Sequence, residues 1–308
     1  MEKSMILLCG IPSEGPIAKV NEALLKLGAQ TVIFSQRQFA DAELEWSFVN
    51  RKPSGYLHLF NCSYSLEDFR GIYTRFMSET ELPEMKSASE AMRKHGLNLH
   101  DSFYQWLEVT DACVVNRHST MFSNSSKPYQ MQIIRRYGLK IPPTLITNDL
   151  EKLKEFKQQH KRIIYKSISG VRSIVKEFQA EDEERLSLIH YCPVQFQALL
   201  DGFDVRVHVI GQRTIATKIL TTGTDYRYAH QDGGDTDLEA YQIPDSVADA
   251  CIRLSAALGL HFSGIDLRFT PDGQVYCFEV NPMPGYSYYE NNTGQPISQT
   301  LAEYLMNA

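Results

Sequence analysis

Residues 263–282 constrain the fold of this chain more than any other stretch. Two apolar-rich runs, residues 263–269 and 275–282, flank the tripeptide Pro271-Asp272-Gly273. Pro presets its own φ, Asp bonds the local backbone and Gly tolerates positive φ, so this tripeptide is typical of a tight turn. The segment therefore predicts a β-hairpin.

Polar side chains gather on one face of this hairpin. If the two strands pair directly across the turn, Asp266 lies opposite Cys277, and Glu279 falls on the same face at a diagonal distance of about 7–8 Å between backbones. Asn281 returns to that face two residues later. Two carboxylates and a carboxamide are hard oxygen ligands that suit Mg²⁺, which usually shares its shell with water and substrate phosphates. The alternative is the exposed polar face of an edge hairpin.

Composition narrows the classes of protein that remain. The chain has 308 residues, of which 43% are hydrophobic and 22% charged, which is ordinary for a globular protein with two or three sub-domains. A net charge of −6 and a pI of about 5.9 argue against nucleic acid as a partner. No run approaches the ~20 apolar residues of a membrane span or resembles a secretory signal, so we expect a cytoplasmic protein without membrane contact. The six cysteines form no C-x-x-C pair, and we expect most to be buried thiols.

The first 115 residues alternate between strand and helix patterns. Helical spacing between Pro16 and Gly28 and again over residues 87–109 predicts two helices. Strands are expected at residues 5–9, 31–34, 56–60, 71–76 and 112–115. This alternation predicts an open α/β domain with a largely parallel sheet.

Two features of this part are candidates for ligand contacts. Residues 10–15 carry two glycines after a strand, as a phosphate loop does, but Pro16-Ile17 stands where such a loop needs Lys-Ser or Lys-Thr, so we expect only a strand-to-helix turn. Arg75 comes at the end of a strand and could reach toward a substrate, although such an arginine is more often solvated.

A loop rich in Asn and Ser, residues 116–126, marks a domain boundary. A helix is expected from Lys127 to near Gly138. The Asn-x-x-Glu pattern of residues 148–151 predicts the start of another helix. A strand over residues 162–165 then delivers Lys166 to the start of a small, polar loop that includes Ser169.

The last part of the chain has antiparallel character. Strands are expected at residues 194–200, 205–210 and 214–220, followed by a helix that begins at residues 244–246 and by the hairpin. Asp204 and Arg206 share one strand face, and Lys218 lies on the next strand. We therefore divide the chain into residues 1–115, 116–191 and 192–308, with a fold class of α/β and α+β.

Taken together, these features resemble the ATP-grasp superfamily. The resemblance covers most of the chain and is most specific in residues 264–266 and 278–282. Within the superfamily the chain is similar to the ribosomal-protein glutamate-ligase type and to the graspetide (microviridin-type) peptide macrocyclases. The segments that carry this closer likeness are residues 127–130 (Lys-Pro-Tyr-Gln), 194–197 (Val-Gln-Phe-Gln) and 289–297. It implies an ATP-grasp fold preceded by an open α/β pre-ATP-grasp domain.

The resemblance also implies roles for individual residues. The metal ligands would be Asp266, Glu279 and Asn281. The nucleotide contacts would come from Lys127, Lys166, Ser169, Gln197, Ala198, Leu199 and Leu200. The charges near the phosphates and the acceptor would be Arg206, Lys218 and Arg227. The chain departs from the pattern after Gln197, where its relatives usually carry Glu-Tyr-Ile and this sequence has Ala-Leu-Leu. Backbone contacts to adenine survive that change, whereas an acidic side-chain contact does not.

The implied activity is an ATP- and Mg²⁺-dependent ligase. A substrate carboxylate would attack the γ-phosphate, and an amine or hydroxyl would capture the acylphosphate. Two rivals stay open: a phosphotransferase that stops after phosphate transfer, and an ATP-binding regulatory protein without turnover. The sequence leaves open whether the substrates are peptides or small molecules, whether the product is an amide or an ester, and whether the chain forms a homo-oligomer.

Overall fold

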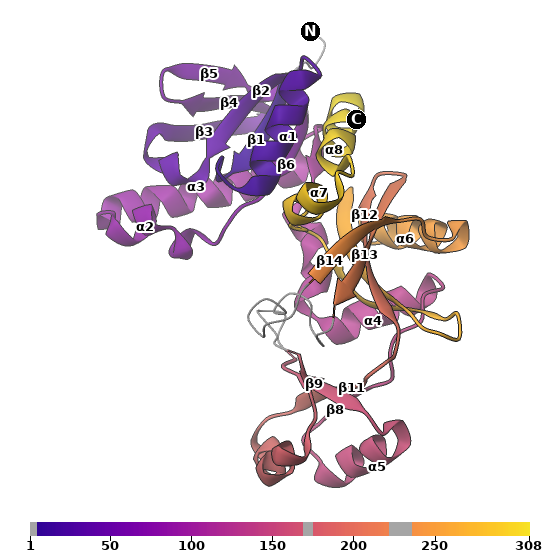
Figure 1. The fold of residues 1–308 in the computed structure, drawn as a ribbon. Coiled ribbons are helices and arrows are strands. Elements are labelled where there is room, and N and C mark those ends of the chain that lie inside the picture. Colours follow the sequence, from indigo (N-terminus) through magenta and orange to yellow (C-terminus); the bar gives the residue numbers. More distant parts are fainter. Residues whose placement is uncertain (1–4, 169–174, 222–235) are drawn as a thin grey trace. The chain divides into compact units, whose positions relative to one another are not determined.

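The computed structural model describes residues 5–168, 175–221 and 236–308 (Figure 1). The chain forms two compact units. The first contains residues 1–121, 259–262 and 283–308, and the second contains residues 122–258 and 263–282. The division into three parts that we expected from the sequence stays a prediction.

The first unit contains a parallel sheet in the order β2-β1-β6-β7. Its strands are β1 (Met5–Gly10), β2 (Gln30–Ser35), β6 (Phe69–Thr74) and β7 (Cys113–Val115). The predicted open α/β start is therefore confirmed. The loop after β1 is the expected strand-to-helix turn, because α1 (Gly15–Lys26) begins with Pro16 in its first turn, and Gly28 follows it at a φ of +77°.

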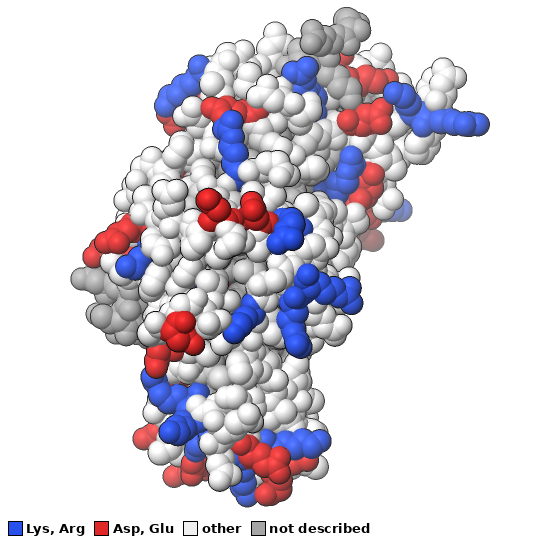
Figure 2. Space-filling view, turned by 90° about the vertical axis from the view of Figure 1, so that its right-hand side faces the viewer, with Lys and Arg blue, Asp and Glu red and all other residues white. Residues whose placement is uncertain are grey.

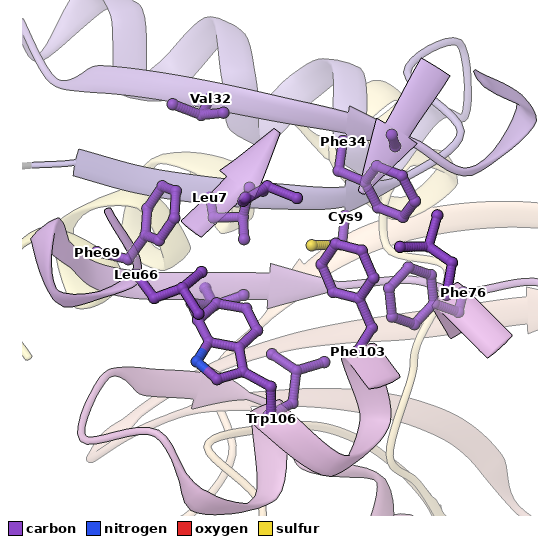
Figure 3. Packing of buried hydrophobic residues seen from close by; sticks show 14 of the residues in the cluster. Leu7, Cys9, Val32, Phe34, Leu66, Phe69, Phe76, Phe103 and Trp106 are labelled. Carbon is purple, nitrogen blue, oxygen red and sulfur yellow. The ribbon is translucent and has the colours of Figure 1, made fainter. Parts of the chain in front are cut away.

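A second helix builds the core of this unit. Helix α3 (Glu90–Val109) begins where the Ser89 side chain accepts a hydrogen bond from the Met92 N–H. Its Phe103 lies next to Cys9 and its Trp106 lies near Phe69, both against the buried face of the sheet (Figure 3). The remaining helices of the unit are α2 (Pro83–Ser87), α7 (Ser287–Thr293) and α8 (Ile297–Asn307), and α8 packs on α1 and β6.

Three antiparallel strands of this unit were not predicted as a sheet. They are β3 (Ala42–Val49), β4 (Lys52–Leu59) and β5 (Cys62–Ser65). The strand expected at residues 56–60 is the end of β4 and does not belong to the parallel sheet. The turn between β3 and β4 places Asn50 and Arg51 at positive φ without a glycine, so the usual hairpin signal is absent from the sequence.

The second unit begins with a small sheet in the order β10-β9-β11-β8. Its strands are β8 (Thr144–Thr147), β9 (Ile163–Lys166), β10 (Lys176–Glu177) and β11 (Val194–Ala198). The same part of the unit contains the helices α4 (Lys127–Arg136) and α5 (Leu150–His160). Helix α5 forms as predicted, but its N-cap is Asp149 instead of Asn148. The Asp149 carboxylate accepts from the N–H groups of Glu151 and Lys152.

The second sheet of this unit is antiparallel and has five strands in the order β14-β13-β12-β15-β16. They are β12 (Phe203–Ile210), β13 (Arg213–Thr221), β14 (Thr236–Tyr241), β15 (Phe262–Phe269) and β16 (Val275–Asn281), with α6 (Asp245–Ala257) packed on β12 and β13. The predicted hairpin is confirmed as β15 and β16, and β16 forms one edge of the sheet. This edge strand carries two of the predicted metal ligands.

The distribution of charges and the burial of the cysteines can be compared with what the composition predicts. On the face drawn in Figure 2, lysine and arginine are interspersed with aspartate and glutamate among the described residues. All six cysteines are described and free; Cys9, Cys251 and Cys277 are buried as expected, but Cys62 and Cys192 are exposed. None of the helices in the described ranges has the length and apolar character needed to cross a bilayer.

Candidate functional site

The hairpin brings Asp266 and Glu279 directly opposite each other. The register pairs Asp266 with Glu279 and Gly264 with Asn281, so these polar side chains share one face. The expected pairing of Asp266 with Cys277 was wrong. At the turn Phe269 pairs with Val275, one residue beyond the expected register, so Cys277 pairs with Leu267 instead. A β-bulge at Phe278 then shifts the register by one more residue between Leu267 and Asp266. The register at the turn and the bulge together replace the expected diagonal between the two carboxylates with direct opposition.

Cys277 does not belong to this polar face. Its side chain is fully buried, and burial, with smaller contributions from neighbouring groups, raises the pKa of its thiol well above the ordinary value. The thiol therefore stays protonated and is a poor metal ligand. The candidate ligands on this face are oxygen donors.

Arg206 of β12 binds Asp266 in a two-pronged ion pair. Its Nε lies 2.8 Å from Oδ1 and its Nη2 lies 3.1 Å from Oδ2, with only 8% of the arginine side chain and 16% of the aspartate side chain exposed. This geometry orients the Asp266 carboxylate and offsets one of the two facing negative charges. The charge of Glu279 leaves a net attraction for a cation on this face.

A second ion pair on the same strands reaches the end of β11. Arg268 donates from Nε and Nη2 to the two carboxylate oxygens of Asp204, each at 2.7 Å, and from Nη1 to the carbonyl of Leu200, also at 2.7 Å. Arg268 also lies over the ring of Phe278, the bulged residue. Arg268 therefore ties the segment after β11 to the sheet that carries Asp266.

A cavity joins these groups to the small sheet. It is lined by Ile164, Lys166, Val175, Gln197, Ala198, Leu199, Leu200, Asp204, Asp266, Leu267, Arg268, Phe278 and Glu279. Seven of the thirteen residues that we assigned to the site from the sequence line it. Its volume of about 90 Å³ is smaller than the ~300–1,000 Å³ of a complete ligand pocket. The cavity therefore has room for only part of a ligand as large as a nucleotide.

Residues 197–200, which we expected to contact adenine through their backbone, line one end of the cavity. Lys166 Nζ lies 3.5 Å from Gln197 Oε1, and Gln197 Nε2 donates to Thr144 Oγ1 at 3.0 Å. The N–H groups of Ala198 and Leu199 already donate to the carbonyls of Pro143 and Arg162. A base in this cavity would therefore meet other backbone groups of residues 197–200.

Lys127 and Asn281 adjoin this arrangement without lining the cavity. Lys127 is the first residue of α4 and only 8% exposed. Three residues later on the same helix, the Gln130 side chain bonds to Val280, between Glu279 and Asn281. The helix that carries Lys127 is thus attached to the strand that carries the metal-ligand candidates.

The structure separates Lys218 from Arg206. Lys218 pairs with Val205, whereas Arg206 pairs with Thr217, so the register directs Lys218 to the opposite face of the sheet from Arg206 and Asp266. There its Nζ lies 4.7 Å from the centre of the Phe203 ring. The sequence placed Lys218 on the neighbouring strand correctly but could not give the strand register. Ser169 and Arg227 lie outside the described residues.

The oxygen ligands on this face are typical of a magnesium site that is completed by water and substrate, and not of a metal site built from protein ligands alone. Within residues 5–168, 175–221 and 236–308, no three His, Cys, Asp or Glu side chains lie close enough to form a metal site by themselves. Asp266, Glu279 and Asn281 instead supply three protein oxygens on one face. Mg²⁺ binds through one or two carboxylates together with substrate phosphates and water, so these residues fit the ion.

The sequence reasoning missed three contributors to this arrangement. Arg268 alternates with Asp266 along β15 and therefore shares its face, a signal that was present in the sequence. Asp204 was placed on the face of Arg206, but its pairing with Arg268 depends on which strands are neighbours. The bulge at Phe278 has no sequence signal that we recognised.

Comparison with known proteins gives a consistent result. Residues 124–305, more than half of the chain, match the family model of the RimK-like ATP-grasp domain. A probable alpha-L-glutamate ligase from Rhodopirellula baltica is 25% identical over 215 residues, which are 64% of this chain and 51% of that protein. The chain therefore spans about half the length of this curated relative.

Solved structures extend the likeness over the whole chain. An RiPP-associated ATP-grasp ligase from Chryseobacterium gregarium, in complex with ADP and a leader and core peptide, matches with a TM-score of 0.83 and 22% identity, over 100% of this chain and 97% of that one. The ATP-grasp ligase PsnB, in complex with a precursor variant, Mg and ADP, matches with a TM-score of 0.78 and 24% identity, over 100% and 99%. The predicted ATP-grasp fold is confirmed, and the chain belongs to the RimK-like ATP-grasp family.

Proposed function

We propose that this protein is an ATP-dependent ligase that joins a carboxylate to an amine or hydroxyl, with a peptide as substrate. The observation that carries the proposal is the single cavity that brings together the end of β11, Lys166, and the opposed carboxylates of Asp266 and Glu279. Family membership supports ATP use. The peptide substrate is supported by the structural likeness to ligases that hold precursor peptides.

In the proposed reaction, a carboxylate oxygen of the substrate attacks the γ-phosphorus of ATP, and the bond between that phosphorus and the bridging oxygen to the β-phosphate breaks. ADP leaves, and the product is an acylphosphate. The amine or hydroxyl then attacks the acyl carbon, loses a proton, and displaces inorganic phosphate. No covalent bond to the enzyme is needed, so the protein acts by positioning and charge neutralisation.

The residues of the cavity divide this work. Asp266, Glu279 and Asn281 would hold Mg²⁺, which when bound offsets the negative charge of the phosphates. Lys166 and the backbone of residues 197–200 would hold the nucleotide, with Lys127 as a second cation. Arg206 orients Asp266 and adds a fixed positive charge next to the metal-ligand candidates. Lys218 is placed on the other sheet face and has no part in this assignment.

The partners stay at the level of chemical class. The proposal takes a peptide carboxylate and an amine or hydroxyl acceptor, with neither nucleic acid nor membrane as partner. A homo-oligomer, the cytoplasmic location and the choice between amide and ester product stay predictions.

The test is ATP turnover with candidate peptides. We expect ADP and inorganic phosphate in equal amounts, together with a peptide product that mass spectrometry shows to have lost water or gained an amino acid. A phosphorylated product without free phosphate would contradict the ligase and indicate a phosphotransferase. ADP binding without turnover of any peptide would indicate a regulatory protein.

The Glu279→Gln variant tests the metal assignment. It keeps the shape of the side chain but removes the negative charge opposite Asp266, so we expect turnover to fall by about 100-fold or more, or about 3 kcal/mol. A variant at the exposed Glu22 of α1, Glu22→Gln, is the control and should keep full activity. Unimpaired turnover in Glu279→Gln would contradict the assignment.

A further inference from the structure

Gln130 of α4 pairs with β16 as a neighbouring strand would. Its Oε1 accepts from the N–H of Val280 at 2.8 Å, and its Nε2 donates to the carbonyl of the same residue at 2.8 Å. The side chain is 2% exposed, so water cannot easily replace it. One amide group thus satisfies both backbone groups of one residue.

The outer edge of β16 explains why such a contact is needed. This strand is the last of its sheet, so its outward backbone groups have no strand partner. Lys140 covers the first half of the edge, because its N–H donates to the carbonyl of Val275 and its carbonyl accepts from the N–H of Cys277. Gln130 covers the half that contains the metal-ligand candidates.

Val280 stands between Glu279 and Asn281. Its own side chain is fully buried, and its two neighbours point to the other face because side chains alternate along a strand. Fixing both backbone groups of Val280 therefore fixes the direction in which Glu279 and Asn281 leave the strand. The bulge at Phe278 makes this support more important, because bulges locally disrupt the regular pairing of the strand.

The same helix carries Lys127. Residues three apart lie on the same side of a helix, so Lys127 and Gln130 project in similar directions from α4. The Gln130 bonds thus link the predicted phosphate lysine to the strand of the predicted metal ligands through one rigid helix.

We infer that Gln130 is a positioning residue for the Mg²⁺-nucleotide site, which it serves by holding the backbone between Glu279 and Asn281. The inference rests on the proposed function, since it takes these two residues as metal ligands. The Gln130 amide itself is bound to the Val280 backbone, so its role is to position the strand. Loss of such an outer support typically weakens metal affinity by about 10–100-fold.

The first unit offers a matched control. Gln36 is also 2% exposed, and it also pairs with one backbone residue, because its Nε2 donates to the carbonyl of Met77 at 2.6 Å and its Oε1 accepts from the N–H of Met77 at 2.9 Å. Gln36→Met and Gln130→Met therefore remove the same pair of amide–backbone hydrogen bonds. Val280 is fully buried, whereas Met77 is 45% exposed and water can partly replace its bonds, so Gln36→Met should lower stability by the smaller amount.

The experiment measures ADP binding by calorimetry across a Mg²⁺ titration, together with thermal unfolding, for the wild type and both variants. We expect both variants to melt at lower temperature. Only Gln130→Met should need about 10–100-fold more Mg²⁺ for half-maximal strengthening of ADP binding, whereas Gln36→Met should need the same Mg²⁺ as the wild type.

Equal Mg²⁺ requirements in the two variants would overturn the inference, because Gln130 would then be structural in the sense that Gln36 is. If Gln130→Met does not fold, Gln130→Glu replaces it: this variant keeps the acceptor for the Val280 N–H, loses the donor to the carbonyl, and should shift the Mg²⁺ requirement in the same direction. A wild type whose ADP binding ignores Mg²⁺ would contradict the proposed function and, with it, this inference.

Discussion

Two buried arginines, one in each unit, bind a carboxylate in nearly the same way but in different surroundings. Arg75 follows β6 and donates to both oxygens of Glu14 and to the carbonyl of Pro284. Arg206 in β12 binds both oxygens of Asp266. Each arginine side chain is 8% exposed.

The two arginines differ in the groups that surround their ion pairs. Arg75 is held by Glu14 and by the Pro284 backbone, and both partners belong to its own unit, so the hypothesis that it reaches a substrate has no support in its contacts. Asp266, the partner of Arg206, faces a second carboxylate and lines a cavity. Burial and ion pairing are therefore common to both arginines, and we base the proposed role of Arg206 on the second carboxylate and the cavity beside its partner.

The largest effect on stability should come from Arg75→Met. This change removes a buried arginine side chain and leaves Glu14, which is 36% exposed, without its partner, so it should destabilise the first unit by about 2 kcal/mol. Urea unfolding followed by tryptophan fluorescence measures this unit alone, because both tryptophans, Trp46 and Trp106, belong to it. Mg²⁺ and ADP should not restore the loss; restoration would show that Arg75 serves the nucleotide site.

Arg206→Met should impair turnover and leave the stability of the first unit unchanged. We expect turnover to fall by about 100-fold, because Asp266 loses the partner that orients it and the site loses a fixed positive charge, and one preorganised group of this kind contributes ~10²–10³-fold in rate. The tryptophan-monitored unfolding of the first unit should stay unchanged. Arg206→Lys, which keeps the charge but not the two-pronged geometry, should recover only part of the rate. Full activity in Arg206→Met would remove the distinction between the two arginines.

A smaller effect concerns His208, which follows Arg206 by two residues on β12. Burial, with a smaller contribution from Arg206, lowers the pKa of His208 well below its ordinary value of 6.5. Below pH 6.5 the unfolded chain binds a proton at this residue that the folded protein refuses, so acid favours unfolding. This one group should therefore lower stability as the pH falls from 7 to 5.

Far-ultraviolet circular dichroism during urea unfolding at several pH values measures this loss. A His208→Gln variant lacks the titrating group and should lose less stability than the wild type over the same range. Equal losses in the two proteins would show that the environment of Arg206 does not extend to His208.

Much of this arrangement could be predicted from the sequence because its signals are local. The turn at residues 271–273 predicted the hairpin, and the spacing of Asp266, Glu279 and Asn281 predicted a shared oxygen face. The helix from Lys127 and the strand that ends at Lys166 also form as expected.

The remaining features depend on strand register and on neighbours far apart in sequence. The register at the turn and the bulge at Phe278 together place Asp266 opposite Glu279 instead of Cys277, and the register of β12 and β13 directs Lys218 to the other face. Neither follows from alternation within one strand, because a shift of one residue reverses every side chain. The Gln130 contact joins residues 150 positions apart, which no local pattern encodes.

The most direct test of the central claim is Mn²⁺ binding in place of Mg²⁺, followed by electron paramagnetic resonance in the presence of ADP, since carboxylate sites accept both ions. We predict one bound Mn²⁺ per chain in the wild type and a loss of about 100-fold in its affinity in Glu279→Gln. Mn²⁺ binding that is the same in both proteins would contradict the claim that the hairpin holds the metal.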